Sequence, residues 1–136
     1  MIEHGIDAPG HARAARDLLL RLPPRTGDIE SAGSAVQREG ETPLEAAVRL
    51  GGTLDGGVLA IQGPPGSGKT YTAAQMVVSL VREGRRVGVT ANSHKVIGRA
   101  LDEIHATAAK AGVPVRIGQR PGQEEKPTCA VATDLK

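Results

Sequence analysis

The sequence predicts an α/β fold in which a short parallel sheet is flanked by helices and preceded by a helical N-terminal segment. Three observations support this fold class. Beyond Gly57, short apolar runs with β-branched residues alternate with longer segments of helical periodicity. A glycine follows each of these helical segments. A glycine-rich loop joins the first apolar run to the helical segment behind it, as expected at a strand-to-helix junction.

Composition limits the size of the domain and the kind of partner. The chain has 136 residues, which suffice for one domain of about 100–150 residues. Its 17 basic and 15 acidic residues leave a net charge of +2, which permits nucleic-acid binding without arguing for it. The sole aromatic residue is one tyrosine, so the chain has no aromatic platform on which single-stranded bases would stack.

The sequence has no signal for secretion, a metal centre or a membrane span. Cys129 is the single cysteine, so no internal disulfide can form, and no Cys/His set has metal-ligand spacing. The N-terminus lacks the basic and apolar regions of a signal peptide. Apolar runs such as 58–61 are far too short to cross a bilayer. We therefore expect a cytoplasmic protein with no membrane partner.

The chain divides into three predicted parts, which are an N-terminal helical segment over 1–24, a linker over 25–41 and a domain over 42–136. An amphipathic helix is expected over 1–22. Its apolar stripe comprises Ala15, Leu18, Leu19 and Leu22. The proline pair at 23–24 ends this helix, because proline lacks the backbone donor and restricts the residue before it.

Each element of the third part has a local signal. Thr42 as N-cap, Pro43 at the first helical position and Glu45 in a capping box predict a helix that ends near Gly51 and Gly52. Strands are expected over 58–61, 86–91 and 113–117, and helices over 69–83 and 93–111, with Gly84 and Gly112 at the helix ends. This alternation implies a parallel sheet with right-handed crossovers. The tail over 118–136 has no predicted element.

The glycine-rich loop predicts a phosphate site. Residues 63–70 read Gly-Pro-Pro-Gly-Ser-Gly-Lys-Thr, a full match to the pattern G-x-x-x-x-G-K-[ST]. Glycines let the backbone wrap closely around a polyphosphate, and the N–H groups at the start of the following helix point at the anion. Lys69 is expected to reach the β- and γ-phosphates, and Thr70 to offer its hydroxyl to Mg²⁺.

Two segments resemble superfamily 1 DNA/RNA helicases. Residues 61–72 are similar to the Walker A segment of this family, and residues 87–97 to its motif Ia. The resemblance covers roughly residues 42–117, and it is nearest to the helicase part of bacterial fusions that carry a RecB-like nuclease upstream. In those fusions a Leu-rich helix and an Arg-Pro segment precede the motor, as residues 18–25 do here. The resemblance implies a partial RecA-like P-loop NTPase fold.

The resemblance also implies cofactors, partners and site residues. ATP and Mg²⁺ would be the cofactors, and single-stranded DNA or RNA the partner of the parent motor, together with the missing motor lobe or a RecB-like nuclease domain. The nucleotide would be bound by Gly63, Pro64, Pro65, Gly66, Ser67, Gly68, Lys69, Thr70 and Tyr71, with Lys69 and Thr70 as catalytic residues and Thr70 as the magnesium ligand. Nucleic acid would be bound by Thr90, Asn92, Ser93, His94 and Lys95, and Arg99 lies one helical turn beyond Lys95. Tyr71 either supports the adenine or packs, and the basic face either contacts phosphates or is merely solvated.

Two departures from the family pattern limit the expected activity. Glu45 occupies the position where these helicases usually have an adenine-reading glutamine, and an ionised carboxylate offers no donor. Hydrolysis also needs a carboxylate for Mg²⁺ and a base for water, which the family supplies as Asp-Glu after four apolar residues. Asp134 is the nearest candidate, but Leu135 follows it. We therefore expect a motor truncated before Walker B, which binds ATP without turnover by this chain alone.

Two other function classes remain open. A small P-loop phosphotransferase of the kinase type would need lid arginines, for which Arg116 and Arg120 are the nearby candidates, whereas the motif over 90–95 argues against it. A non-catalytic module that binds nucleotide or nucleic acid and regulates a partner predicts ATP binding without turnover, as the helicase fragment does.

Overall fold

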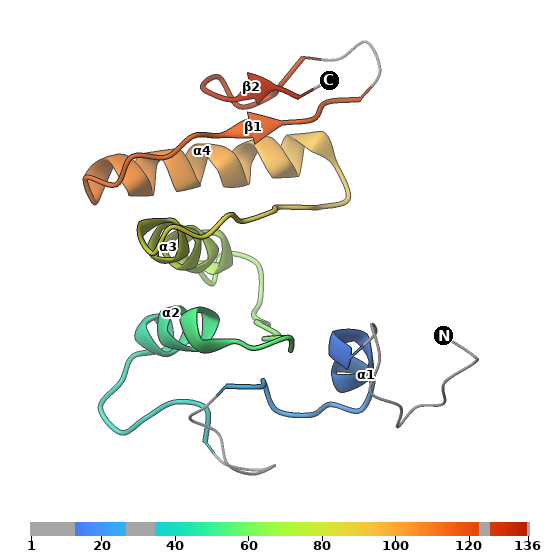
Figure 1. Cartoon of the computed structure of the whole chain (residues 1–136), viewed down its shortest axis with the longest axis vertical. Coiled ribbons are helices and arrows are strands. Elements are labelled where there is room, and N and C mark those ends of the chain that lie inside the picture. The colour runs from blue at the N-terminus through green and yellow to red at the C-terminus, as the bar shows by residue number, and fades with distance from the viewer. Residues whose placement is uncertain (1–12, 27–34, 123–125, 136) are drawn as a thin grey trace. The chain divides into compact units, whose positions relative to one another are not determined.

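The computed structural model describes residues 13–26, 35–122 and 126–135, within which it has four helices and one two-stranded sheet (Figure 1). The helices are α1 (Arg13–Leu19), α2 (Pro43–Thr53), α3 (Lys69–Arg82) and α4 (His94–Lys110), and the strands are β1 (Gly118–Gln119) and β2 (Thr133–Asp134). The two strands pair in parallel, with Gly118 opposite Thr133 and Gln119 opposite Asp134. The predicted α/β class with a short parallel sheet is therefore confirmed.

The chain folds into two compact units, Met1–Gly63 and Pro64–Lys136. The first unit contains α1, which ends at Leu19 and not at the predicted residue 22, and residues 1–12 of the expected helix lie outside the described residues. The predicted apolar stripe faces solvent, and Leu19 is 72% exposed. The buried residue of α1 is Asp17 instead. A polar contact of the Asp17 carboxylate holds the described part of this helix.

That polar contact joins α1 to the segment behind it. The Arg25 guanidinium donates to both carboxylate oxygens of Asp17, at 2.5 and 2.9 Å, and this contact lowers the pKa of Asp17. The Arg25 carbonyl accepts a hydrogen bond from the Asp55 amide at 2.9 Å. Residues beyond α1 and residues beyond α2 therefore lie against each other within the first unit.

Helix α2 begins as the sequence predicts. Thr42 is its N-cap, Pro43 stands at the first helical position, and both hydrogen bonds of the capping box to Glu45 are present. The helix continues through Gly51 and Gly52 to Thr53. Its buried side chains are Ala46, Ala47 and Leu50, which form a small apolar face.

The second unit is built on α3 and α4, which pack against each other, with the β1–β2 pair next to α4 (Figure 1). Its buried cluster consists of Ala74, Val78, Leu101, Ile104, Ala108 and Cys129. Both helices end as predicted, at Gly84 and Gly112, whose φ angles are 80° and 64°. At each end the glycine amide and the next amide bond back to carbonyls of the last turn, which is a Schellman motif.

The predicted strands over 58–61, 86–91 and 113–117 are not strands in the structure, and the described residues pair only at β1 and β2. Over 113–117 the side chains alternate between half-buried and exposed, as in a strand. Strand pairing begins only where the segment at Thr133 lies alongside, and there the Thr133 amide donates to the Ile117 carbonyl at 2.9 Å. The tail over 118–136, for which no element was predicted, thus supplies both β1 and β2, and periodicity alone did not reveal them.

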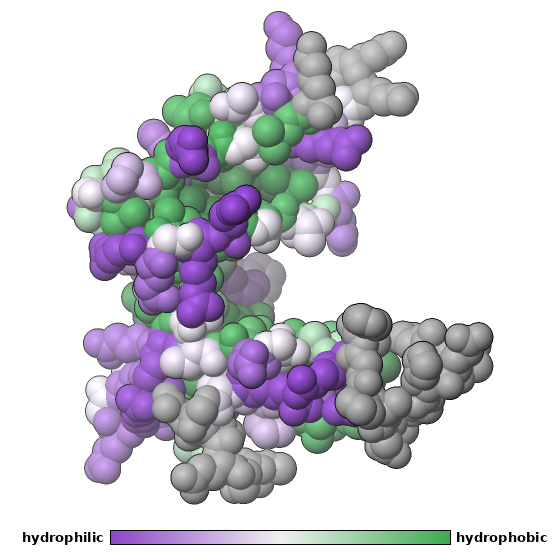
Figure 2. All heavy atoms as spheres, in the orientation of Figure 1, coloured by the Kyte–Doolittle hydropathy of each residue, from purple (hydrophilic) through white to green (hydrophobic). Residues whose placement is uncertain are grey.

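Large apolar side chains are exposed in both units, and Figure 2 shows hydrophobic and hydrophilic residues interspersed on the face drawn. They include Leu18, Ile61, Tyr71, Val96 and Val131. None of the helices in the described parts of the chain combines the length and the apolar character that crossing a bilayer demands.

Candidate nucleotide-binding site

The phosphate loop leads directly into α3. Gly66 and Gly68 have φ angles of 82° and 81°, in the left-handed region that side chains avoid. A Cβ atom at either position would meet nothing within 4 Å, so the backbone conformation, and not crowding, requires glycine there. The Ser67 amide donates to the Pro64 carbonyl at 3.2 Å and closes the turn. A turn with left-handed residues of this kind can direct its N–H groups toward an anion.

Lys69 lies over this turn. Its Nζ donates to the Pro64 carbonyl at 2.7 Å and lies 3.4 Å from Ser67 Oγ. The ammonium therefore points back across the loop and not away from it. A phosphate oxygen that binds in the turn would replace the Pro64 carbonyl as the acceptor for this charge.

The first turn of α3 offers backbone donors. Its N-cap is Gly68, which makes no side-chain cap hydrogen bond, and no acidic residue lies in the first turn. The opening N–H groups of a helix have no intrahelical acceptor, and the helix dipole adds positive potential there. The 14-residue helix therefore presents a positive N-terminus beside the Lys69 ammonium.

Thr70 and Tyr71 are both exposed, like every residue from Pro64 through Lys69. The Thr70 hydroxyl is a hard oxygen ligand of the kind that Mg²⁺ accepts. Among the described residues there is no group of three or more His, Cys, Asp or Glu side chains placed to hold a metal. A magnesium ion at this site would therefore take most of its ligands from phosphate oxygens and water, as is usual for this ion.

The residues predicted to bind nucleic acid surround the start of α4 and fall into two groups. Ser93 has a structural role, because its Oγ accepts from the Val96 amide at 3.3 Å as the N-cap of α4. The His94 carbonyl accepts from the Thr128 hydroxyl at 3.0 Å, and its ring Nδ1 is buried without a hydrogen-bond partner among the described residues. In contrast, Thr90, Asn92, Lys95 and Arg99 are exposed.

Sequence reasoning missed the contacts that hold the tail. The Gln119 side chain is 3% exposed, and its Oε1 accepts from the amides of Thr128 and Cys129 at 3.0 and 3.1 Å. The Thr128 side chain occupies the space beside Gly98 of α4, where a Cβ atom would lie only 2.1 Å from the Thr128 Oγ1. A glycine inside a helical stripe signals such a close approach, so Gly98 was the available clue.

Asp134, the candidate magnesium ligand, and Cys129, the single cysteine, also lie in this tail. Asp134 is exposed on β2, opposite Gln119. Cys129 is buried, and burial together with the Asp102 carboxylate raises the pKa of its thiol. A buried thiol of raised pKa packs as a small apolar side chain and is unreactive.

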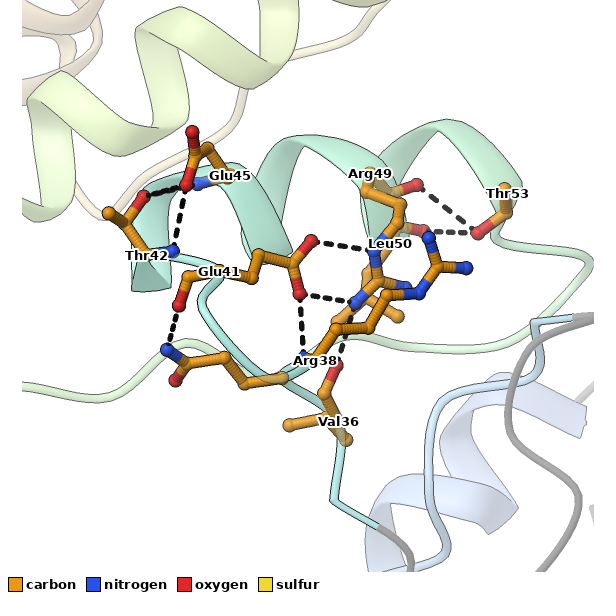
Figure 3. Close-up of polar contacts among 9 residues, drawn as sticks. Val36, Arg38, Glu41, Thr42, Glu45, Arg49, Leu50 and Thr53 are labelled. Carbon is orange, nitrogen blue, oxygen red and sulfur yellow. Dashed lines mark hydrogen bonds and ion pairs between the residues drawn. The ribbon is translucent and has the colours of Figure 1, made fainter.

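Glu45, at the expected position of the adenine-reading glutamine, is bound within its own helix start (Figure 3). Its Oε2 accepts from the Thr42 amide at 2.8 Å and from the Thr42 hydroxyl at 2.7 Å, and these bonds lower its pKa. Next to it, the Arg49 guanidinium binds both carboxylate oxygens of Glu41 at 2.7 Å. Arg49, with help from the Arg38 amide, lowers the pKa of Glu41 to about 2.

Comparison with known proteins gives two partial relatives. Copalyl diphosphate synthase of Streptomyces anulatus is 35% identical over 104 residues, which are 75% of this chain and 16% of the relative. The signal recognition particle 54 kDa protein of Pyrobaculum neutrophilum is 39% identical over 67 residues, which are 49% of this chain and 15% of the relative. The chain thus spans about a sixth of the length of these curated relatives. No family model matches the chain, and no solved structure matches it.

Proposed function

We propose that the chain is the ATP-binding portion of a superfamily 1-type helicase or ATPase that acts on nucleic acid. Its second unit would be part of a RecA-like P-loop NTPase domain, with Mg²⁺ as the companion ion. The observation that supports this most is the loop before α3, where two left-handed glycines and the Lys69 ammonium surround one turn. The sequence of that loop and its place at a helix start agree.

The donor set suits a magnesium-bound triphosphate. Backbone N–H groups and the helix dipole would hold the phosphate oxygens, and Lys69 would neutralise charge on the outer phosphates. Thr70 would contribute one hydroxyl to the metal. None of these groups reacts covalently, so the role of the site would be to position the phosphates and offset their charge.

The exposed residues at the start of α4 fit the contact with nucleic acid in the same proposal. Lys95 and Arg99 lie four residues apart on one helix face and are both exposed. Cations in this spacing suit phosphates along a single strand and carry no base specificity. Thr90 and Asn92 add exposed polar side chains just before the helix.

The direct test is calorimetric titration of the purified chain with Mg·ATP. We expect Lys69→Ala to weaken binding by roughly tenfold to a hundredfold, because it removes a charge-assisted contact to phosphate. The matched control is Lys110→Ala, which removes an exposed lysine from the last turn of α4. The control should bind as the unchanged chain does.

Equal affinity of the Lys69→Ala variant and the unchanged chain would refute the nucleotide site. The same samples would report turnover, measured with and without single-stranded DNA. We expect none from the chain alone. Turnover that DNA stimulates would show a complete motor, whereas turnover independent of DNA would favour the phosphotransferase class.

A further inference from the structure

We propose that this site recognises the magnesium-bound triphosphate and not the base, so that ATP, GTP, CTP and UTP bind with nearly equal affinity. The inference rests on the proposed function, because it concerns the selectivity of the same loop. It extends that function from ATP to nucleoside triphosphates as a class.

The donors at the loop suit phosphate. The first turn of α3 presents backbone N–H groups, and the side chains of Ser67 and Lys69 lie beside it. Ammonium, hydroxyl and amide donors bind any phosphate oxygen, whatever base is attached to the nucleotide. These contacts therefore contribute the same free energy to each nucleoside triphosphate.

Exposure of the loop argues against selection of a base. All residues from Pro64 through Tyr71 are exposed. Hydrogen bonds discriminate strongly only where the wrong ligand leaves a buried donor or acceptor unpaired. An exposed donor or acceptor that a wrong base leaves unpaired is simply solvated by water, so the penalty is small. The described loop has no buried polar group that would impose such a penalty.

Tyr71, the single aromatic residue of the chain, directly follows the loop, and an aromatic ring can stack on any base. It follows Thr70 on α3 and is 47% exposed. An aromatic ring stacks on every base because every base has a π-face, so such a contact adds affinity without selectivity. The ring would strengthen binding of nucleotides over bare triphosphate, and it would do so to a similar degree for all four.

Exchange of the Lys69 contact is also common to all the nucleotides. The ammonium donates to the Pro64 carbonyl at 2.7 Å, and any triphosphate must take over this donor. The free energy of that exchange depends on the phosphates alone. Preference among the nucleotides would therefore have to come from groups that contact the base.

The experiment measures competition on the full chain. Mg·ATP is titrated first, and Mg·GTP, Mg·CTP, Mg·UTP and magnesium tripolyphosphate are then used as competitors. We expect the four nucleotides to have dissociation constants within about threefold of one another, because no buried partner is lost. Tripolyphosphate should displace each of them. Tyr71→Ala should weaken all four nucleotides by the same factor and leave tripolyphosphate unchanged.

Two results would overturn the inference, and they differ in what they leave standing. Binding of ATP more than about tenfold tighter than GTP, still dependent on Lys69, would refute base indifference and retain the proposed nucleotide site. Failure of all four nucleotides to bind would refute both. Failure of tripolyphosphate to displace ATP would also overturn the inference, because it would show that the base or sugar supplies the affinity.

Discussion

The starts of α2 and α3 solve the same problem in opposite ways. At α2 the open N–H groups are satisfied by side chains of the chain itself, since Thr42 and Glu45 form a complete capping box. At α3 the N-cap is Gly68, with no side-chain cap and no acidic residue in the first turn. The comparison shows two uses of the N–H groups in a first helical turn. Side chains of the same chain can satisfy them, or they can stay available as donors for an anion.

The strongest way to break this contrast is to give α3 a cap like that of α2. Gly68→Asp would place a carboxylate among the N–H groups that the phosphates need. We expect ATP affinity to fall by at least about a hundredfold, because the new charge both occupies the donors and repels the ligand. Calorimetric titration with Mg·ATP measures the loss.

Gly40→Asp is the matched control for that change. Gly40 has a φ of 75° and, like Gly68, open space around its Cβ position. Both variants therefore carry the same backbone strain, about 1–2 kcal/mol. Normal nucleotide binding by Gly40→Asp, with binding lost in Gly68→Asp, would assign the effect to the site. An equal loss in both would assign it to strain and refute the contrast.

A smaller effect is expected from opening the start of α2. Thr42→Ala removes the hydroxyl that accepts from the Glu45 amide at 3.2 Å. Loss of such a cap costs about 1 kcal/mol of helix stability. Amide hydrogen exchange in the first turn of α2 should therefore become about fivefold faster.

Thr53→Ala, at the other end of α2, serves as the control because its hydroxyl bonds only to carbonyls of the last turn. It should leave exchange in the first turn unchanged, and both variants should retain nucleotide binding. Unchanged exchange in Thr42→Ala would show that the capping box adds nothing measurable.

Acid should weaken the start of α2 and leave the start of α3 unaffected. The pKa of Glu41 is lowered from 4.5 to about 2, chiefly by Arg49, and that of Glu45 is lowered by Thr42. A carboxylate with a lowered pKa stabilises the fold fully above its unfolded pKa. That stability is lost as the pH falls through the folded pKa, here between about 4.5 and 2.

NMR titration of the Glu41 and Glu45 carboxyl groups measures their pKa values, and amide hydrogen exchange in α2 and α3 measures the loss of stability. We expect protection in α2 to decrease across that pH window, and Glu41→Gln to remove most of the dependence. The first turn of α3 has no acidic residue, so its protection should not follow the same curve. A Glu41 carboxyl that titrates near its ordinary pKa would contradict the proposed contact with Arg49.

Local signals account for what could be predicted. The capping box at Thr42, the phosphate loop at Gly66 and Gly68, and the glycine helix ends at Gly84 and Gly112 each depend on residues within one turn of one another. Their chemistry is readable from adjacent residues, because a cap or a left-handed turn needs no distant partner.

Contacts between distant residues account for what was not predicted. The 86–91 segment has the composition of a strand, but a ladder requires a partner, and sequence does not say where that partner lies. The Gln119 contacts reach 9 and 10 residues along the chain to Thr128 and Cys129. The buried Asp17 carboxylate is paired with Arg25, eight residues along the chain. At the candidate site, the sequence predicted the phosphate loop, but it did not predict that the residues from Pro64 through Tyr71 are all exposed, because exposure depends on how distant segments pack.

The contact between Thr128 and α4 has a consequence for the order in which the second unit forms. The Thr128 hydroxyl reaches back 34 residues to the His94 carbonyl, and its neighbour Cys129 completes the buried cluster. Closing so long a loop slows folding, because the chain loses conformational entropy before the contact contributes favourable free energy. During synthesis on the ribosome, α4 therefore emerges before the tail, and its surface at Gly98 and one side of the buried cluster stay open to chaperones until the tail has been synthesised.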